Sequence, residues 1–446
     1  MKRNIILSLI IYGVGIACNA QTLSLDSCKT YALENNKKLK EALLKCDEAE
    51  QVRKNAFTNY FPTVNASVMA MKANKGLIEG EIPEMNLPVY DGNPVNLENP
   101  TLFTYFPGMS LELLDYANAG MLSAVQPVYA GGRIRNGNKL AALGEEFSEH
   151  QLNLTTDEVL VATEYYYWTI LALKEKKKTL EEYEKLLNSL LNDVNVAYEA
   201  GLIHKSDLLK VQLELNNIEA NKIKLENALS LLKMTLAQHI GTEYSESFDI
   251  IDTSITVNNP ATLFYNPEDA LLNRDEYQML NKAIDVEILQ KKMARGEYMP
   301  SVAIGVQGLY LDIMDQNNNY GIAFVTVSIP ISGWWGGSHK IQEHQIKVEV
   351  AQNNLEEKTE LLKLQMDKAY KDLTESYKQI EVAESSVEQA TEHLSVMKDS
   401  FDAGIVSTSD LLEAQAMFQK SQDSLVDAKT TCQIKLAEYL KTTGRL

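Results

Sequence analysis

The strongest constraint on this chain is that its sequence contains one unit twice. The segment AGLIHKSDLL at residues 200–209 recurs as AGIVSTSDLL at residues 403–412, an offset of 203 residues. The same offset relates Pro127 to Pro330, so this part of the unit runs without a gap. Self-similarity over such a length predicts one structural unit used twice in the chain.

The two copies differ by an insertion in the first. Upstream of the repeat the offset becomes 238, as between Pro62 and Pro300, so 35 extra residues lie between Pro62 and Pro127. We therefore expect a first copy at residues 21–241, a linker at 242–266 and a second copy at 267–446, each with the order helix, two strands and long helical hairpin.

The overall charge excludes one class of partner. The formal net charge is −19, and removal of a leader with Lys2 and Arg3 leaves 40 basic against 61 acidic residues. Nucleic acid requires a basic face, so it is not an expected partner. An acidic soluble surface and an acidic channel wall both fit this charge.

The first 20 residues have the features of a secretory signal peptide. A basic head is followed by the apolar stretch 5–16 and by Cys18-Asn19-Ala20, which predicts cleavage after Ala20. The alternative is a lipoprotein cut before Cys18. Beyond this leader no apolar run of 18 residues exists, so no membrane-spanning helix is expected. A membrane β-barrel remains compatible with the sequence, because its strands are short and alternating.

The strands are expected in pairs at about 62–72 and 119–130, and at about 300–312 and 320–331. In most of them, apolar residues alternate with small or polar ones; the apolar series are Val64, Ala66, Val68, Ala70; Val302, Ile304, Val306, Tyr310; and Val325, Val327, Ile329. Such alternation suits a wall with lipid on one side and water on the other, or a half-buried soluble sheet. Residues 73–118 show no periodicity and predict a long surface loop, and residues 312–319 predict a short polar one.

The helices are expected to carry most of the mass. Each copy should begin with one helix, near 26–60 and near 267–298, and long helices are expected at about 133–200 and 339–403. Three-four spacing of apolar residues predicts coiled-coil packing of each long helix with the helix after its Ala-Gly turn. Gly201 and Gly404 should be the C′ residues of these turns, and Ser206 and Ser409 the caps of the next helices.

The strand count bears on the oligomer. Four strands are too few to close a barrel, eight enclose a space that side chains fill, and three chains with twelve strands would hold water. The chain is therefore expected to be mainly α and internally duplicated, with long antiparallel coiled-coil hairpins and with four strands that three copies could join in one 12-stranded barrel.

The chain resembles the TolC-type outer-membrane efflux protein family. The resemblance is carried by the LDSCKTYALENN opening at 25–36, by QPVYAGG at 126–132 and by the doubled Ala-Gly and Ser-Asp-Leu-Leu turn. It implies a fold that is mainly α with transmembrane β, in which the long antiparallel coiled-coil hairpins form an α-barrel and the four strands of each chain join a shared 12-stranded outer-membrane β-barrel. The assembly implied is a homotrimer in the outer membrane of a Gram-negative bacterium, extending into the periplasm. It also implies docking to a periplasmic adaptor and, through it, to a proton-driven or ATP-driven inner-membrane pump.

The resemblance assigns roles to the hairpin ends. The adaptor-docking residues by position are Ala200, Gly201, Leu202, Ile203, Ala403, Gly404, Ile405 and Val406. The alternative is that they are ordinary helix C-caps with a hydrophobic contact. Asp410 and Glu413, with Asp207 as the copy-one equivalent, match an acidic ring at the periplasmic gate, in which like charges would raise some pKa values. The alternative for the two aspartates is helix N-terminal charge favoured by the helix dipole.

No motif for catalysis, a cofactor or a metal is present. The six histidines are scattered, no phosphate loop or Cys-x-x-Cys exists, and Cys432 falls on a helix seam. A Cys28–Cys46 disulfide would span about 27 Å along one helix unless that helix breaks. We expect no enzyme but a passive exit channel of a tripartite efflux or type I secretion system. The alternatives are a soluble periplasmic coiled-coil scaffold or adaptor, and an enzyme with a helical handle. The sequence leaves the cargo and the pump class open.

Overall fold

The structure is a computed structural model that describes residues 22–75, 77–113, 116–252, 255–313 and 316–446. The predicted signal peptide and the alternative lipid site at Cys18 lie outside the described residues. The chain forms two compact units, one built from residues up to 49 with 145–284 and 350–446, and one from 50–144 with 285–349.

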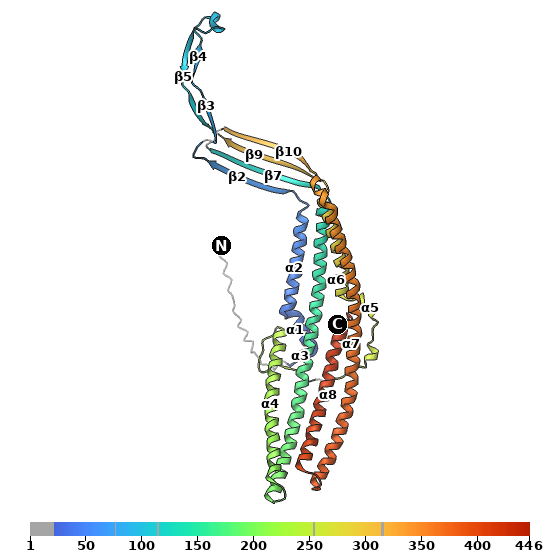
Figure 1. The fold of residues 1–446 in the computed structure, drawn as a ribbon. Coiled ribbons are helices and arrows are strands. Elements are labelled where there is room, and N and C mark those ends of the chain that lie inside the picture. The colour runs from blue at the N-terminus through green and yellow to red at the C-terminus, as the bar shows by residue number, and fades with distance from the viewer. Residues whose placement is uncertain (1–21, 76, 114–115, 253–254, 314–315) are drawn as a thin grey trace, which may run out of the picture. The chain divides into compact units, whose positions relative to one another are not determined.

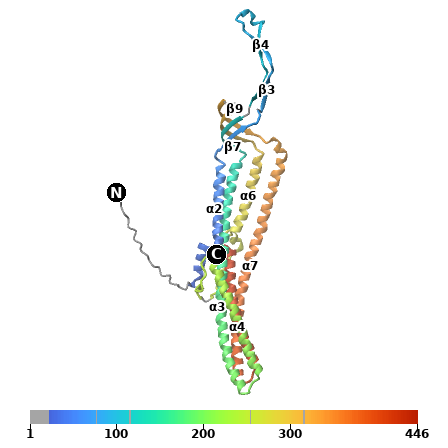
Figure 2. The same ribbon diagram turned by 90° about the vertical axis from the view of Figure 1, so that its left-hand side faces the viewer.

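Two helical hairpins dominate the first unit (Figures 1 and 2). The first joins α3 (Arg133–Glu199) to α4 (Lys205–His239), and the second joins α7 (Trp334–Asp402) to α8 (Thr408–Thr442). The predicted three-four seam is where the buried residues lie: Leu208, Val211 and Ile218 in α4, and Leu411, Ala414, Cys432 and Tyr439 in α8. Lys222, the polar interruption of the α4 seam, pairs with Glu184 of α3 at 3.1 Å.

The two hairpins also pack on each other. One hydrophobic cluster contains Leu187 of α3, Val211 of α4 and Leu411 of α8, with Leu394 and Phe401 of α7 against it. Polar contacts join the same helices: the Lys176 ammonium of α3 lies 2.7 Å from the Asp427 carboxylate of α8. The duplicated hairpins therefore share one hydrophobic cluster next to their turns, whereas each also has a separate cluster farther along its helices.

The helix that opens each copy is broken, contrary to the prediction of one continuous helix. Copy one has α1 (Leu25–Asn35) and α2 (Lys37–Thr58), and copy two has α5 (Pro267–Leu271) and α6 (Asp275–Glu297). At the first break, the Asn36 side chain accepts hydrogen bonds from the N–H groups of Lys38 and Leu39 and so caps α2. The cap competes with helix continuation, as asparagine side chains commonly do.

Equivalent residues anchor both breaks to the end of the second hairpin helix of their copy. The Asn36 amide donates to the His239 carbonyl at 2.7 Å. In copy two the buried Arg274 guanidinium donates to the Thr442 carbonyl and pairs with Glu276 at 2.6 Å. Asn36 and Arg274 are related by the offset of 238, and His239 and Thr442 by the offset of 203. The same contact is therefore present in both copies, although the residue types differ.

The cysteines form no disulfide within the described chain. Cys28 is fully buried, and burial raises the pKa of its thiol to about 12. Cys46 lies on α2, beyond the break at Asn36, and its thiol donates to the Ser148 carbonyl at 3.3 Å. Cys432 is fully buried on the α8 seam, as predicted. All three thiols are free.

In the second unit the chain forms one four-stranded antiparallel sheet. Its strands are β2 (Thr63–Lys72), β7 (Tyr116–Ala130), β9 (Ser301–Ile313) and β10 (Gln316–Ser328), in the order β10-β9-β7-β2. Residues 316–319 pair within β10, so most of the predicted polar loop at 312–319 is strand. The last strand ends at Ser328 rather than near 331, and a short 3₁₀ helix (Ile331–Gly333) leads directly into α7.

The segment 73–118, predicted as an irregular loop, also contains strands. The strand β3 (Ile78–Ile82) pairs with β6 (Met109–Leu113), and β4 (Met85–Val89) pairs with β5 (Leu102–Phe106). A 3₁₀ helix (Pro94–Leu97) lies between β4 and β5. Periodicity did not predict this ribbon, because a two-stranded ribbon with no buried face needs no polar-apolar alternation.

Candidate functional site: the hairpin ends and the sheet face

Both hairpins turn through the same backbone motif. Gly201 and Gly404 adopt φ of 74° and 71°, the left-handed conformation that favours glycine. The Leu202 N–H donates to the Ala197 carbonyl, and the Ile405 N–H to the Ser400 carbonyl, each at 2.9 Å. These are Schellman caps, so the predicted C′ glycines are where the structure has them.

The turns expose apolar side chains. Leu202 and Ile405, which are equivalent by the 203-residue offset, are 78% and 77% exposed. Ile203 instead packs against the cluster shared by the hairpins, and Val406 is half-buried. The flanking residues Ala200, Gly201, Ala403 and Gly404 are exposed. The sequence-predicted docking residues therefore form two similar surfaces, each with one prominent apolar side chain.

The caps of the helices that follow differ from the prediction. The α8 cap is Ser407, not Ser409, and it forms a capping box with Asp410: the Asp410 N–H donates to Ser407 Oγ at 3.3 Å, and the Ser407 N–H to Asp410 Oδ2 at 2.8 Å. The α4 cap is His204, whose side chain makes no capping bond. Ser206 and Ser409 lie inside the first turns because the connection between each Schellman cap and the next helix is two residues shorter than expected.

Two of the predicted gate residues, Asp207 and Asp410, lie in the first turns of α4 and α8, and Glu413 lies in the second turn of α8. Asp410 and Glu413 are exposed and Asp207 is half-buried. Hydrogen bonds from Ser407 hold the pKa of Asp410 below its usual value in the single chain, so its carboxylate is ionised at neutral pH. Asp410 therefore takes part in the helix cap and still presents an exposed carboxylate.

Sequence reasoning missed a cation among these acids. The Lys210 ammonium lies 3.4 Å from Asp207 Oδ1 and donates to Ser409 Oγ at 2.7 Å, so it bridges the first turns of α4 and α8. The signal was present as the i,i+3 spacing of Asp207 and Lys210.

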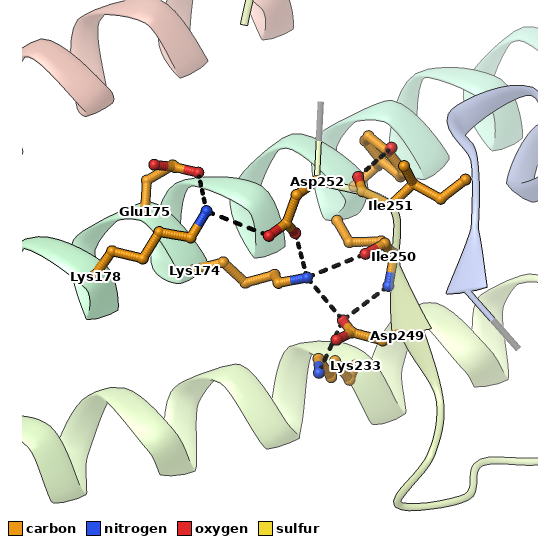
Figure 3. Close-up of polar contacts among 9 residues, drawn as sticks. Lys174, Glu175, Lys178, Lys233, Asp249, Ile250, Ile251 and Asp252 are labelled. Carbon is orange, nitrogen blue, oxygen red and sulfur yellow. Dashed lines mark hydrogen bonds and ion pairs between the residues drawn. The ribbon is translucent and has the colours of Figure 1, made fainter. Parts of the chain in front are cut away.

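A second polar cluster fastens the linker to the first hairpin. Strand β8 (Asp249–Ile250) of the linker pairs with β1 (Thr22–Leu23), and its carboxylates face the lysines of α3 and α4 (Figure 3). Lys174 pairs with Asp249 at 3.2 Å and with Asp252, and it donates to the Ile250 carbonyl at 3.1 Å. Lys233 pairs with Asp249 at 2.9 Å, and Lys178 with Asp252 at 3.3 Å.

This linker network predicts a loss of stability in acid. Partial burial raises the pKa of Asp249 and Asp252, but the lysine hydrogen bonds outweigh it and hold both pKa values below the usual range. A depressed pKa contributes stability above the unfolded value of about 3.9, and that contribution disappears as the pH falls through the folded value. Lys174→Met should therefore lower the thermal midpoint at pH 7 and flatten its fall below about pH 4.

Lys45→Met is the matched control, since Lys45 forms an exposed i,i+4 pair with Glu41. It should leave the pH profile of the thermal midpoint unchanged, because exposed pairs contribute little. Identical pH profiles for Lys174→Met and the wild type would contradict a stabilising role for the linker network.

The strand register places the predicted apolar series on one face of the sheet. Val306 pairs with Ala323 and Ala124, and Ala124 pairs with Val64, so these residues share a face across all four strands. The large exposed side chains of this apolar face are Val64, Val68, Leu122, Ile304, Val306, Tyr310, Val325 and Val327. The opposite face carries polar residues among apolar ones: Thr63, Asn65, Ser67, Ser123, Gln307 and Thr326.

Aromatic residues gather where the strands meet the helices in this unit. The Phe57 ring lies 5.5 Å from the Tyr60 ring, and the Trp334 indole N–H donates to the Tyr298 carbonyl at 2.9 Å. Trp335 is 82% exposed. Such clusters are typical of side chains at a membrane–water interface. The sequence signal for this cluster was the pair of tryptophans at residues 334 and 335, with which α7 begins.

Two further observations on the described residues concern membrane-spanning helices and metal sites. None of the helices within these ranges is both long and apolar enough to cross a membrane. In the same part of the chain no group of three or more His, Cys, Asp or Glu side chains is placed to hold a metal ion.

Comparison with known proteins gives the family. The sequence profile of the outer membrane efflux protein family matches residues 30–242 and 266–445, which are the two copies without most of the linker. No curated protein matches the chain in sequence.

Solved structures show the same fold at low identity. The Campylobacter jejuni outer membrane channel CmeC superposes with a TM-score of 0.73 at 14% identity, over 94% of this chain and 85% of that one. The Vibrio cholerae outer membrane protein VceC gives 0.72 at 13% identity, over 94% and 96%. The open state of the Neisseria gonorrhoeae outer membrane channel MtrE gives 0.70 at 14% identity, over 94% and 88%. The duplicated hairpins, the four-stranded sheet and the profile match agree: this chain belongs to the outer membrane efflux protein family.

Proposed function

We propose that three copies of this chain form the passive exit channel of a tripartite efflux or type I secretion system, without an enzymatic step of their own. The observation that carries the proposal is the sheet: its edge strands β2 and β10 are each paired on one side only, and one face is apolar. An unpaired edge is unfavourable in lipid, and a closed ring removes it. Three copies would supply twelve strands, enough to enclose water.

The experiment is to purify the protein from membranes and record it in planar bilayers. A heat-modifiable trimer in the outer-membrane fraction that forms ion-conducting pores is the expected result. Recovery of a water-soluble monomer without pore activity would instead favour the soluble scaffold, the alternative considered from sequence.

The exposed hairpin ends support docking of a periplasmic adaptor. Leu202 and Ile405 are apolar, exposed and flanked by glycine, which permits close approach of a partner helix. We expect Leu202→Asp with Ile405→Asp to weaken binding of a periplasmic adaptor that binds the wild-type protein about tenfold or more, measured with the purified proteins. The control Leu202→Met with Ile405→Met keeps the apolar surface and should bind normally. Equal binding by all three proteins would exclude docking through these residues.

The acids near the start of α8 support a charged periplasmic gate. Threefold repetition of Asp410 and Glu413 would place six carboxylates around one opening, where they attract cations. In single-channel recordings, Asp410→Ala with Glu413→Ala should weaken block by multivalent cations and raise the conductance of the resting channel. Ser407→Ala is the matched control, because it breaks the capping box but keeps both carboxylates. Unchanged conductance and block in the double variant would argue against the gate.

A further inference from the structure

The insertion in copy one forms an ordered ribbon that copy two lacks. It leaves the sheet at the end of β2 and returns to it at the start of β7, and Figure 1 draws it as the narrow blue ribbon labelled β3, β4 and β5. Its outer part is the β4–β5 ribbon, with a turn closed by Asp91. That carboxylate accepts hydrogen bonds from the Asn93 N–H at 2.9 Å and the Asn96 amide at 2.7 Å.

The β4–β5 ribbon is almost entirely apolar. Neither strand contains a charged residue, and only Asn86 and Thr104 have short polar side chains. The remaining residues are Met85, Leu87, Pro88, Val89, Leu102, Phe103, Tyr105 and Phe106. Such a composition is unusual for an exposed ribbon of a chain with a net charge of −19.

Both faces of this ribbon carry exposed apolar side chains, and on one of them the Tyr105 hydroxyl donates to Glu84, just before β4, at 2.7 Å. The pairing puts Val89 opposite Leu102 on one face, whereas Phe103 and Tyr105 point to the other. Leu102, Phe103 and Tyr105 are 54%, 57% and 61% exposed. A two-stranded ribbon alone is marginal in water, and exposed apolar surfaces of this kind mark interaction sites.

Three features indicate that the partner is the same ribbon of other copies. A closed ring of three gives each member two neighbours, which matches a ribbon with two apolar faces, whereas a single partner or a lipid surface would need one. Uncharged strands let copies of one acidic chain approach each other. Pro88 lacks an N–H donor, which disfavours pairing of further strands along β4 and leaves the faces for contact.

We propose that the β4–β5 ribbons of three copies pack face against face and close over the outer opening of the channel. The proposal rests on the trimer of the proposed function. The ribbon leaves the sheet from β2, the edge strand whose free side would meet the next copy in such a trimer, so the contact continues that interface outward.

Crosslinking tests the contact directly. Leu87→Cys with Phe103→Cys places thiols on opposite faces, in a Cys46→Ser background because Cys28 and Cys432 are buried. A short bismaleimide reagent added to the trimer in membranes should give covalent dimers and trimers on denaturing gels. The control is Leu122→Cys on the apolar face of the sheet, which should give none.

Conductance tests the closure. Val89→Lys with Phe103→Lys puts like charges on both faces, so we expect loss of ribbon contact and a rise in single-channel conductance, with the heat-modifiable trimer retained. A trimer without ribbon crosslinks and with wild-type conductance in the lysine variant would overturn the proposal. Absence of any trimer or pore in the unmodified protein would instead refute the proposed function.

Discussion

Replacing Gly131 with alanine is expected to prevent the second unit from folding stably. Gly131 adopts a φ of 62° at the turn from β7 into α3, and a Cβ built there would lie 2.2 Å from the Gly296 carbonyl oxygen. The obstacle is backbone at the end of α6, so it has no flexible side chain to move aside. Left-handed strain and the backbone clash together should cost about 3 kcal/mol or more.

Gly132→Ala separates the clash from the strain. Gly132 also has a positive φ, 78°, but its nearest neighbour to an added Cβ is the Asn136 side chain at 3.6 Å. We expect a cost of only about 1 kcal/mol, from the backbone conformation alone. The measurement is the thermal midpoint of the purified protein by circular dichroism, together with the yield in the membrane fraction. Equal effects of the two substitutions would show that the Gly131–Gly296 approach does not constrain the fold.

Leu187→Ala is expected to loosen the hairpins. Leu187 is fully buried in the cluster that joins α3 and α4 to Leu411 of α8. Its truncation removes buried methyl groups and leaves a cavity, at a cost of about 3 kcal/mol. Because one cluster serves both hairpins, proteolytic cleavage should accelerate in α8 as well as in α3 and α4.

Leu186→Ala is the neighbouring control. Leu186 is 37% exposed, so the same chemical change should cost about 0.5–1 kcal/mol. Denaturant unfolding of the two variants, followed by helix signal, checks the difference. If both variants unfold at the same denaturant concentration, the cluster does not hold the hairpins together.

The long-range organisation was predictable from sequence because repetition and periodicity are global signals. The offset between Gly201 and Gly404 located both hairpin turns, and three-four spacing located the seam. Alternation in the strands also predicted which residues share the apolar face, since residues two apart lie on one side of a strand.

The helix breaks and helix caps were not predictable in the same way, because they depend on local hydrogen bonds between side chains and backbone. Asn36 caps a new helix where the pattern favoured continuation, and Ser407 takes the capping role expected of Ser409. By the repeat offset, Trp334 and Trp335 occupy the positions of Gly131 and Gly132, yet α7 already begins there. Lys210 joined the candidate gate through a contact between α4 and α8, which only the fold brings together.

The two copies of the repeat use different residue pairs at their helix breaks, so single residues cannot be exchanged freely between the copies. The partner of Arg274 is Glu276, and the copy-one counterparts of these two residues are Asn36 and Lys38. An arginine transplanted to position 36 would confront a lysine instead of a carboxylate, whereas an exchange of both positions together would restore attraction. The two residues at each helix break are thus matched to each other within their own copy. A chimera that combines the two copies must therefore exchange both residues of such a pair together.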